Sequence, residues 1–456
     1  MSNKWTWITG TVFGLTVLFL LFSNVIAPLS VEHGINVGYA KGMIQGLMPY
    51  RDMPMEEAPL GIGILGALYA IVGTGASAYW STALLCLTNL LNLWLMYKLM
   101  KRVHLTKPAV WGALGFYLLM LYSSDGLMLR TEPFAVTFLL LTYRFILKRE
   151  KSDLVIAACC FVLALACKSQ SIVLLPALAV PAFWQGRHNR FSAEKGILFC
   201  TTALTFAVIG FILIAWICGD TNWWRGLGWD FTAPQLFQTT KDVLYGKLTY
   251  AVIQAGRCSL FFFIGFFFVW KKMKGYGKQA AATGALAALG GMILLCWDFE
   301  VPYFMPVYPF IALALAHLMK AIEQPMKAGL LWIAVLLIPG ALSIREYLKL
   351  ENGALKSSQQ EEIKALRDIA KVPGNTIVWF DECYEFDLGS QIFTELPQLK
   401  PTDIQGGKHW SEADYIILNE EGFTNVSYSA DSDAFFDAIS SMKSYGTGKL
   451  IVYSKH

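Results

Sequence analysis

The sequence predicts a polytopic α-helical membrane protein with about 11 transmembrane helices and a small extracytoplasmic α/β domain at its C-terminal end. Two observations predict this class. Of the 456 residues, 55% are hydrophobic and only 15% are charged, whereas soluble domains carry about 25% charged residues. The mean hydropathy of the chain is +0.47. This composition excludes an ordinary soluble domain, and no nucleic-acid partner is expected.

Charge divides the chain into two unlike regions near residue 344, where the last apolar run ends. Residues 1–344, the predicted membrane domain, contain 26 Lys and Arg and 15 Asp and Glu, a net charge of +11. Residues 345–456 contain 11 Lys and Arg and 18 Asp and Glu, a net charge of −7. The acidic region is therefore predicted to be a separate domain in water.

The predicted crossings are apolar runs that approach the length needed to span a bilayer, about 17 to 25 residues, or somewhat less when a helix is buried among others. They lie at 7–27, 77–98, 108–123, 131–147, 153–167, 171–184, 196–218, 251–270, 279–297, 302–319 and 328–344. The first run is too long for the core of a signal peptide, so it is interpreted as a retained anchor.

Lys and Arg residues set the predicted orientation, because short loops rich in these residues stay in the cytoplasm. One set of alternate loops holds 17 of them and the opposite set holds 7. The N-terminus is therefore predicted to be cytoplasmic and the 345–456 domain to lie outside. The same count favours an interfacial segment over a crossing for residues 59–72, which are apolar but short and rich in glycine.

The predicted outer loop at 28–58 is crowded with ionisable residues. They are Glu32, His33, Lys41, Arg51, Asp52, Glu56 and Glu57. Carboxylates beside hydrocarbon are costly and indicate a functional site, although a solvated loop is the alternative interpretation.

This loop resembles the first outer loop of the GT-C membrane glycosyltransferases, especially the lipid A aminoarabinose transferases and the protein O-mannosyltransferases. The matching positions are Glu32-His33-Gly34, Tyr39-Ala40, Gly46, Pro49-Tyr50-Arg51-Asp52 and Ala58-Pro59-Leu60. Further similarities are Arg130-Thr131-Glu132, Lys168, and Tyr303 with Pro306 and Pro309. The helix count and the outward domain fit the same architecture.

The resemblance implies transfer of a sugar from a polyprenyl-phosphate donor to a lipid, glycan or protein acceptor. It assigns the acid-base carboxylate to Glu32. The sequence departs from the family pattern here, with Glu32 and His33 in place of an Asp-Glu pair and Ala58 in place of a proline. The longer Glu side chain moves the carboxylate by more than about 1 Å.

The chemistry of this transfer explains the need for such residues. Displacing a phosphate with inversion needs a base for the acceptor proton and positive charge for the departing phosphate. Glu32 is the candidate base, and Arg51, Arg130 and Lys168 are the candidate phosphate ligands. The alternative for Arg130 and Lys168 is that each extends its charge to the lipid headgroups.

The remaining candidate site residues are His33, Asp52, Glu57, Glu132 and Tyr303. Asp52 also suits a turn, Glu132 a helix start, and His33 simple packing. A divalent cation held by the acids of the outer loop stays open, because members of the superfamily differ in metal use.

The C-terminal region alternates helical and strand patterns. Helices are predicted at 357–371 and 431–442, and short buried strands at 375–380, 414–419 and 449–454.

The sequence therefore predicts a cell-envelope glycosyltransferase at the outer face of a bacterial cytoplasmic membrane, in contact with membrane lipid. A flippase or transporter of lipid-linked sugars, or an envelope assembly scaffold, is the alternative. A transporter favours ionisable groups at mid-membrane, whereas here they gather at outer helix ends.

Overall fold

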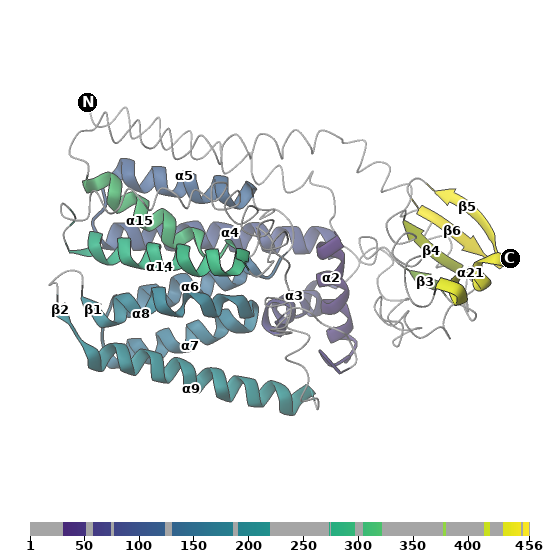
Figure 1. Ribbon diagram of the computed structural model, residues 1–456, viewed down its shortest axis with the longest axis horizontal. Helices are drawn as coiled ribbons and strands as arrows, with labels where there is room; N and C mark the ends of the chain where they lie inside the picture. Colours follow the sequence, from purple (N-terminus) through teal and green to yellow (C-terminus); the bar gives the residue numbers. More distant parts are fainter. Residues whose placement is uncertain are drawn as a thin grey trace, which may run out of the picture.

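The computed structural model is a bundle of helices with a small α/β unit beyond one end (Figure 1). It describes residues 31–51, 58–73, 77–123, 130–185, 190–218, 273, 275–296, 304–321, 377–379, 415–419, 432–447 and 450–455.

The bundle consists of long apolar helices with short connections. Their bounds are α4 Ser77–Arg102, α5 Lys107–Ser123, α6 Glu132–Ile146, α7 Lys151–Cys167, α8 Leu175–Phe183, α9 Ala193–Cys218, α14 Tyr276–Cys296 and α15 Tyr308–Ala321. A 3-10 helix, η1 (Ser169–Leu174), leads into α8, and a short hairpin of β1 (Trp184–Gln185) and β2 (Arg190–Phe191) leads out of it.

Eight of the predicted crossings are confirmed as helical segments by these helices, with η1 and α8 together forming one of them. The predicted crossings at 7–27, 251–270 and 328–344 lie outside the described residues. The prediction for 302–319 began too early, because residues 304–307 form a turn and α15 begins at Tyr308.

The core of the bundle is formed by α6, which packs against α4 and α7, and by the α14–α15 pair. Side chains on almost every face of α15 are buried, so a helix of 14 residues is stabilised by its neighbours. In contrast, α9 exposes large apolar side chains, including Leu204, Ile212 and Trp216. Such a surface is unfavourable in water and suits lipid contact.

Within the described part of the chain, only α4 and α9 are long and apolar enough to cross a membrane by length and composition alone. The other bundle helices are shorter and more buried. An α-helix of 17 residues such as α7 is about 26 Å long, close to the thickness of the hydrocarbon core, about 30 Å.

Two further helices lie at one end of the bundle (Figure 1). They are α2 (Val31–Ile44), inside the predicted outer loop, and α3 (Pro59–Val72), the predicted interfacial segment. They pack on each other through Val37 and Ala40 of α2 and through Ile62, Leu65 and Tyr69 of α3. Residues 59–72 are confirmed as a helix, whereas α2 lies where the sequence predicts a loop.

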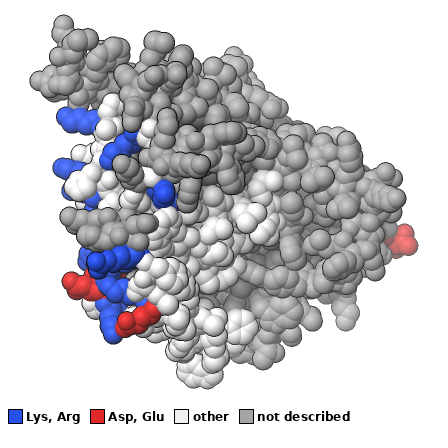
Figure 2. Space-filling view, turned by 60° about the vertical axis from the view of Figure 1, so that its left-hand side comes forward, with Lys and Arg blue, Asp and Glu red and all other residues white. Residues whose placement is uncertain are grey.

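The opposite end of the bundle is basic. Figure 2 shows described Lys and Arg side chains, with a few Asp and Glu, gathered along one end of the surface, and other residue types beyond them. Exposed cations lie at or next to the helix and strand ends of the bundle: Lys101, Arg102, Lys107, Lys151 and Arg190. This is the end that the sequence predicts to be cytoplasmic.

The C-terminal unit contains a four-stranded sheet of order β3-β4-β6-β5 with helix α21 (Ser432–Ser440). The strands are β3 Ile377–Trp379, β4 Tyr415–Asn419, β5 Lys443–Thr447 and β6 Leu450–Ser454. β3 and β4 are parallel and the other pairs are antiparallel. The three predicted strands and the helix at 431–442 are confirmed, whereas β5 was not predicted and the helix at 357–371 lies outside the described residues.

Candidate active site

Three of the predicted site residues lie where α6 begins and α7 ends. Arg130 precedes α6, Glu132 is in its first turn, and Lys168 follows the last residue of α7. Pro133 in the first turn of α6 suits a helix start, because proline lacks the N–H that would have no partner there. Lys168 has an extended backbone, with φ −152° and ψ 105°, which ends α7.

These three side chains are buried rather than turned to the surface. Arg130 is 6% exposed, Lys168 is 2% exposed and Glu132 is completely buried. The interpretation that Arg130 and Lys168 extend to the lipid headgroups is therefore wrong, because such side chains keep their charged ends at the surface. The sequence could not distinguish the two cases, since both place a cation at a helix end.

Lys168 and Glu132 form an ion pair, with 3.0 Å between Lys168 Nζ and Glu132 Oε1. Glu132 therefore has a specific partner in addition to the favourable helix start that the sequence predicts. Glu132 Oε2 has no hydrogen-bond partner among the described residues. A buried carboxylate oxygen of this kind can accept a hydrogen bond from a ligand.

The charge of this end of the bundle favours an anion. Lys41 on α2 is also buried, at 2% exposed, although it was not among the predicted site residues. Among the described side chains, three buried cations, Lys41, Arg130 and Lys168, thus lie at this end with one buried carboxylate, Glu132. Buried Arg and Lys side chains of this kind can form charge-assisted hydrogen bonds with a phosphate.

The start of α6 is held in place by Asn92, a buried residue of α4. Asn92 Nδ2 donates a hydrogen bond to the carbonyl oxygen of Pro133, at 2.9 Å. The hydroxyl of Thr137 donates to Asn92 Oδ1, at 2.7 Å. Asn92 thereby fixes the turn that carries Glu132. The only sequence signal for this role is an amide in the middle of an apolar helix.

Helix α3 covers the same turn. At Gly61, a Cβ atom would lie 2.8 Å from Thr131 Cγ2 and 3.0 Å from Thr131 Cβ, so the close approach of α3 requires glycine. α3 also contacts α7 and α2. The backbone of α2 places Glu32 and His33 in its first turn. The candidate base thus lies on a helix that packs on the cover of the buried ion pair.

The structure does not bring every predicted residue into this group. Arg51 is exposed and follows Tyr50, whose backbone has a positive φ of 64°. Asp52, Glu57 and Tyr303 lie outside the described residues. Within the described part of the chain, no group of three His, Cys, Asp or Glu side chains could hold a metal ion.

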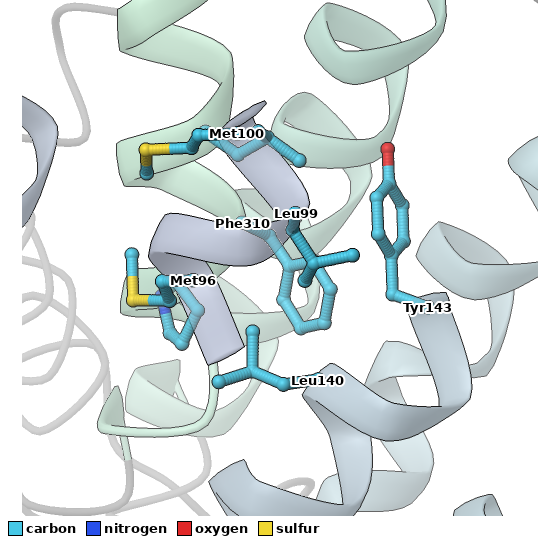
Figure 3. A pocket seen from close by; sticks show the side chains of 8 residues that line it. Met96, Leu99, Met100, Leu140, Tyr143 and Phe310 are labelled. Atoms are coloured by element: carbon cyan, nitrogen blue, oxygen red, sulfur yellow. The ribbon is translucent and has the colours of Figure 1, made fainter. Parts of the chain in front are cut away.

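A small apolar pocket lies elsewhere, between α4, α6 and α15 (Figure 3). Met96, Leu99, Leu140 and Phe310 are among its lining residues, and the ring of Tyr143 stands at one side. Its lining contains no charged side chain, so it is a packing gap rather than a candidate active site.

Comparison with known proteins shows what this chain is similar to. Residues 56–216 match the family model described as dolichyl-phosphate-mannose-protein mannosyltransferase. No curated protein matches the sequence. Among solved structures, ArnT from Cupriavidus metallidurans bound to undecaprenyl phosphate is similar, with a TM-score of 0.57 and 14% sequence identity. The apo state of the same protein gives a TM-score of 0.59 and 12% identity. Both matches cover 100% of this chain and 99% of the other, and at these identities they show a shared fold.

Proposed function

We infer that this chain is a glycosyltransferase of the GT-C type and that it moves a sugar from a polyprenyl-phosphate donor to an acceptor at the outer face of the cytoplasmic membrane. The family model and the two structural matches confirm the resemblance to this superfamily. The donor class is supported by the undecaprenyl phosphate bound in one of the similar structures.

One observation carries the proposal within this chain. At the end of the bundle that carries α2 and α3, the described side chains include three buried cations, Lys41, Arg130 and Lys168, and one buried carboxylate, Glu132. A protein rarely buries such charge without a ligand or a function. A lipid phosphate at the membrane surface has the negative charge and the acceptor oxygens that Arg and Lys side chains bind.

The proposed reaction is an inverting transfer. The acceptor attacks the anomeric carbon, the bond from this carbon to the phosphate oxygen breaks, and polyprenyl phosphate leaves. Glu32 takes the acceptor proton, so that a new glycosidic bond forms without a covalent enzyme intermediate. Since phosphate is already a good leaving group, cations replace a second carboxylic acid.

The other residues have supporting roles in this proposal. Arg130 and Lys168 bind the departing phosphate, and Arg51 contributes from the surface. Glu132 holds Lys168 in position. His33, Asp52, Glu57 and Tyr303 remain candidates for contacts to the sugar or the acceptor.

Glu32→Gln tests the base. Full-length wild type and variant are purified in detergent and given a native lipid extract containing polyprenyl-phosphate sugars and a cell-envelope acceptor fraction. Mass spectrometry then quantifies free polyprenyl phosphate. We expect release by wild type and a loss of at least about 100-fold in the variant, because general bases contribute about 10²–10⁴-fold. Glu150→Gln, an exposed carboxyl at the basic end, is the control and should release normally.

The outcomes separate the hypotheses. Unchanged release by Glu32→Gln would retain the transferase and exclude Glu32 as its base. No release by the wild type, with an extract that a known transferase can consume, would favour the carrier or scaffold alternative.

A further inference from the structure

The turn between α7 and α8 contains a buried serine to which the proposed reaction gives no role. Ser171 is 1% exposed, and its hydroxyl has no hydrogen-bond partner among the described residues. Burying a hydroxyl group without a partner is unfavourable, so most such groups in proteins are satisfied by protein, water or ligand. The hydroxyl of Ser171 is therefore available to donate a hydrogen bond to a bound ligand.

The backbone places Ser171 beside Lys168. The Ser171 N–H donates a hydrogen bond to the carbonyl oxygen of Lys168, at 3.0 Å, and closes the first turn of η1. Ser171 and Lys168 therefore close the same turn, and the side chain of Lys168 forms the ion pair with Glu132.

The turn is held firmly by the neighbouring helix α14. A Cβ atom at Gly290 would lie 2.7 Å from the carbonyl oxygen of Val173 and 3.3 Å from its Cβ. This close approach packs the backbone of α14 directly on η1. The hydroxyl without a partner is therefore part of a packed element.

We propose that Ser171 donates a hydrogen bond to a phosphate oxygen of the polyprenyl-phosphate donor, next to Lys168. This inference rests on the proposed function and adds a donor-binding residue to it. The ammonium group of Lys168 can only donate hydrogen bonds, and the hydroxyl of Ser171 can donate a second one. A phosphate oxygen accepts both, and a hydrogen bond to a charged acceptor is stronger than one to a neutral group. The neutral hydroxyls of a sugar would form weaker hydrogen bonds with this pair of donors.

Binding of undecaprenyl phosphate to the purified full-length protein tests this contact, with undecaprenol as the matched lipid without phosphate. We expect Ser171→Ala to bind undecaprenyl phosphate about tenfold more weakly, since a hydrogen bond to a charged group contributes about this much. Binding of undecaprenol should not change. Without lipid, the Tm of Ser171→Ala should equal or exceed that of wild type, because the variant removes a buried hydroxyl without a partner.

Ser169→Ala is the matched control in the same turn. The hydroxyl of Ser169 already contacts Gln170 Oε1, at 3.2 Å, so its loss should leave lipid binding unchanged. Ser171→Cys keeps a side chain of similar shape with a much weaker donor, and it should show the same selective loss as Ser171→Ala.

Three results would overturn the inference. If wild type and Ser171→Ala bind undecaprenyl phosphate equally, the hydroxyl contacts water or no ligand, while the proposed function stands. If Ser171→Ala loses both lipids equally, its effect is structural rather than a contact to phosphate. If wild type binds neither lipid, the proposed function fails together with this inference.

Discussion

Lys168 and Glu132 depend on each other because both are withdrawn from water, with side-chain exposures of 2% and 1%. Each charge alone would be strongly disfavoured in this environment. The 3.0 Å contact between them compensates one cation with one carboxylate, whereas Arg130 and Lys41 add further buried positive charge. The ion pair therefore keeps both groups charged at an end of the bundle where Arg130 and Lys41 are also buried.

Lys168→Met tests this dual role. The variant leaves Glu132 buried without its partner, so we expect the free energy of unfolding to fall by about 3–5 kcal/mol. The double variant Lys168→Met with Glu132→Leu removes both charges and should recover most of this loss. Binding of undecaprenyl phosphate should be lost in both. Thermal unfolding in detergent and lipid binding, measured on the same samples, give the two readouts.

The control is Lys151→Met. Lys151 pairs with Glu194 at 2.8 Å, but these side chains are 73% and 69% exposed, and surface pairs contribute little. Normal lipid binding by the Lys168→Met and Glu132→Leu double variant would show that Lys168 has only a structural role.

At the scale of elements, α3 acts as a cover over the start of α6. The contact depends on Gly61, whose neighbour across the interface is Thr131, the residue between Arg130 and Glu132. A displacement of α3 would therefore shift Thr131 and the buried charged residues on either side of it. It would also shift α2, which carries Glu32.

Gly61→Ala tests the cover. Its new methyl group would lie 2.8 Å from Thr131 Cγ2, so α3 must move or the core must strain, at a cost of about 1–3 kcal/mol. We expect sugar transfer to fall severalfold, and Tm to fall as well. Gly63→Ala is the matched control on the same helix, because the nearest atom to its Cβ, Met43 Cε, is at 3.7 Å and leaves room. Equal activity of the two variants would contradict the role of this close contact.

The sequence predicts best those elements that have a long, uninterrupted apolar pattern. Apolar runs identify α4 and α9, because a long hydrophobic helix needs no partner to be recognised. Helix α2 is missed because Gly34, Gly38 and Gly42 lower its helix propensity, and its packing on α3 overrides that preference. Strand β5 contains Lys443 and Gly446 and is stabilised mainly by its pairing with β6.

In the candidate site, too, the sequence does not show the contacts that depend on tertiary packing. The resemblance of short motifs selects Arg130, Glu132 and Lys168, but only the fold shows that Lys168 and Glu132 are buried and paired. Asn92 and Ser171 could not be selected from the sequence, since an amide or a hydroxyl in an apolar helix has no distinctive pattern. Their roles follow from which hydrogen bonds are made and which are missing.

On the scale of the whole molecule, the two ends of the bundle differ in whether their Lys and Arg side chains are buried or exposed. At the end of α2 and α3, Lys41, Arg130 and Lys168 are buried. At the other end, most described cations are exposed and lie in one band (Figure 2). Buried cations are typical of a binding site for an anion. Exposed cations are typical of a surface in contact with the cytoplasm and anionic headgroups. The C-terminal unit lies beyond the end that carries α2 and α3 (Figure 1).

This asymmetry predicts the orientation of the chain in the membrane. Alkaline phosphatase fused after the C-terminal strand β6 should be active, because the enzyme folds only outside the cytoplasm, and green fluorescent protein at the same position should be dark. Fusions that end at Lys148, between α6 and α7 at the basic end, should give the opposite pattern. The reverse result at both positions would place the buried cations on the cytoplasmic side. The polyprenyl-phosphate donor would then have to be used at the inner face of the membrane, although the chemistry assigned to Glu32 and Lys168 would be unchanged.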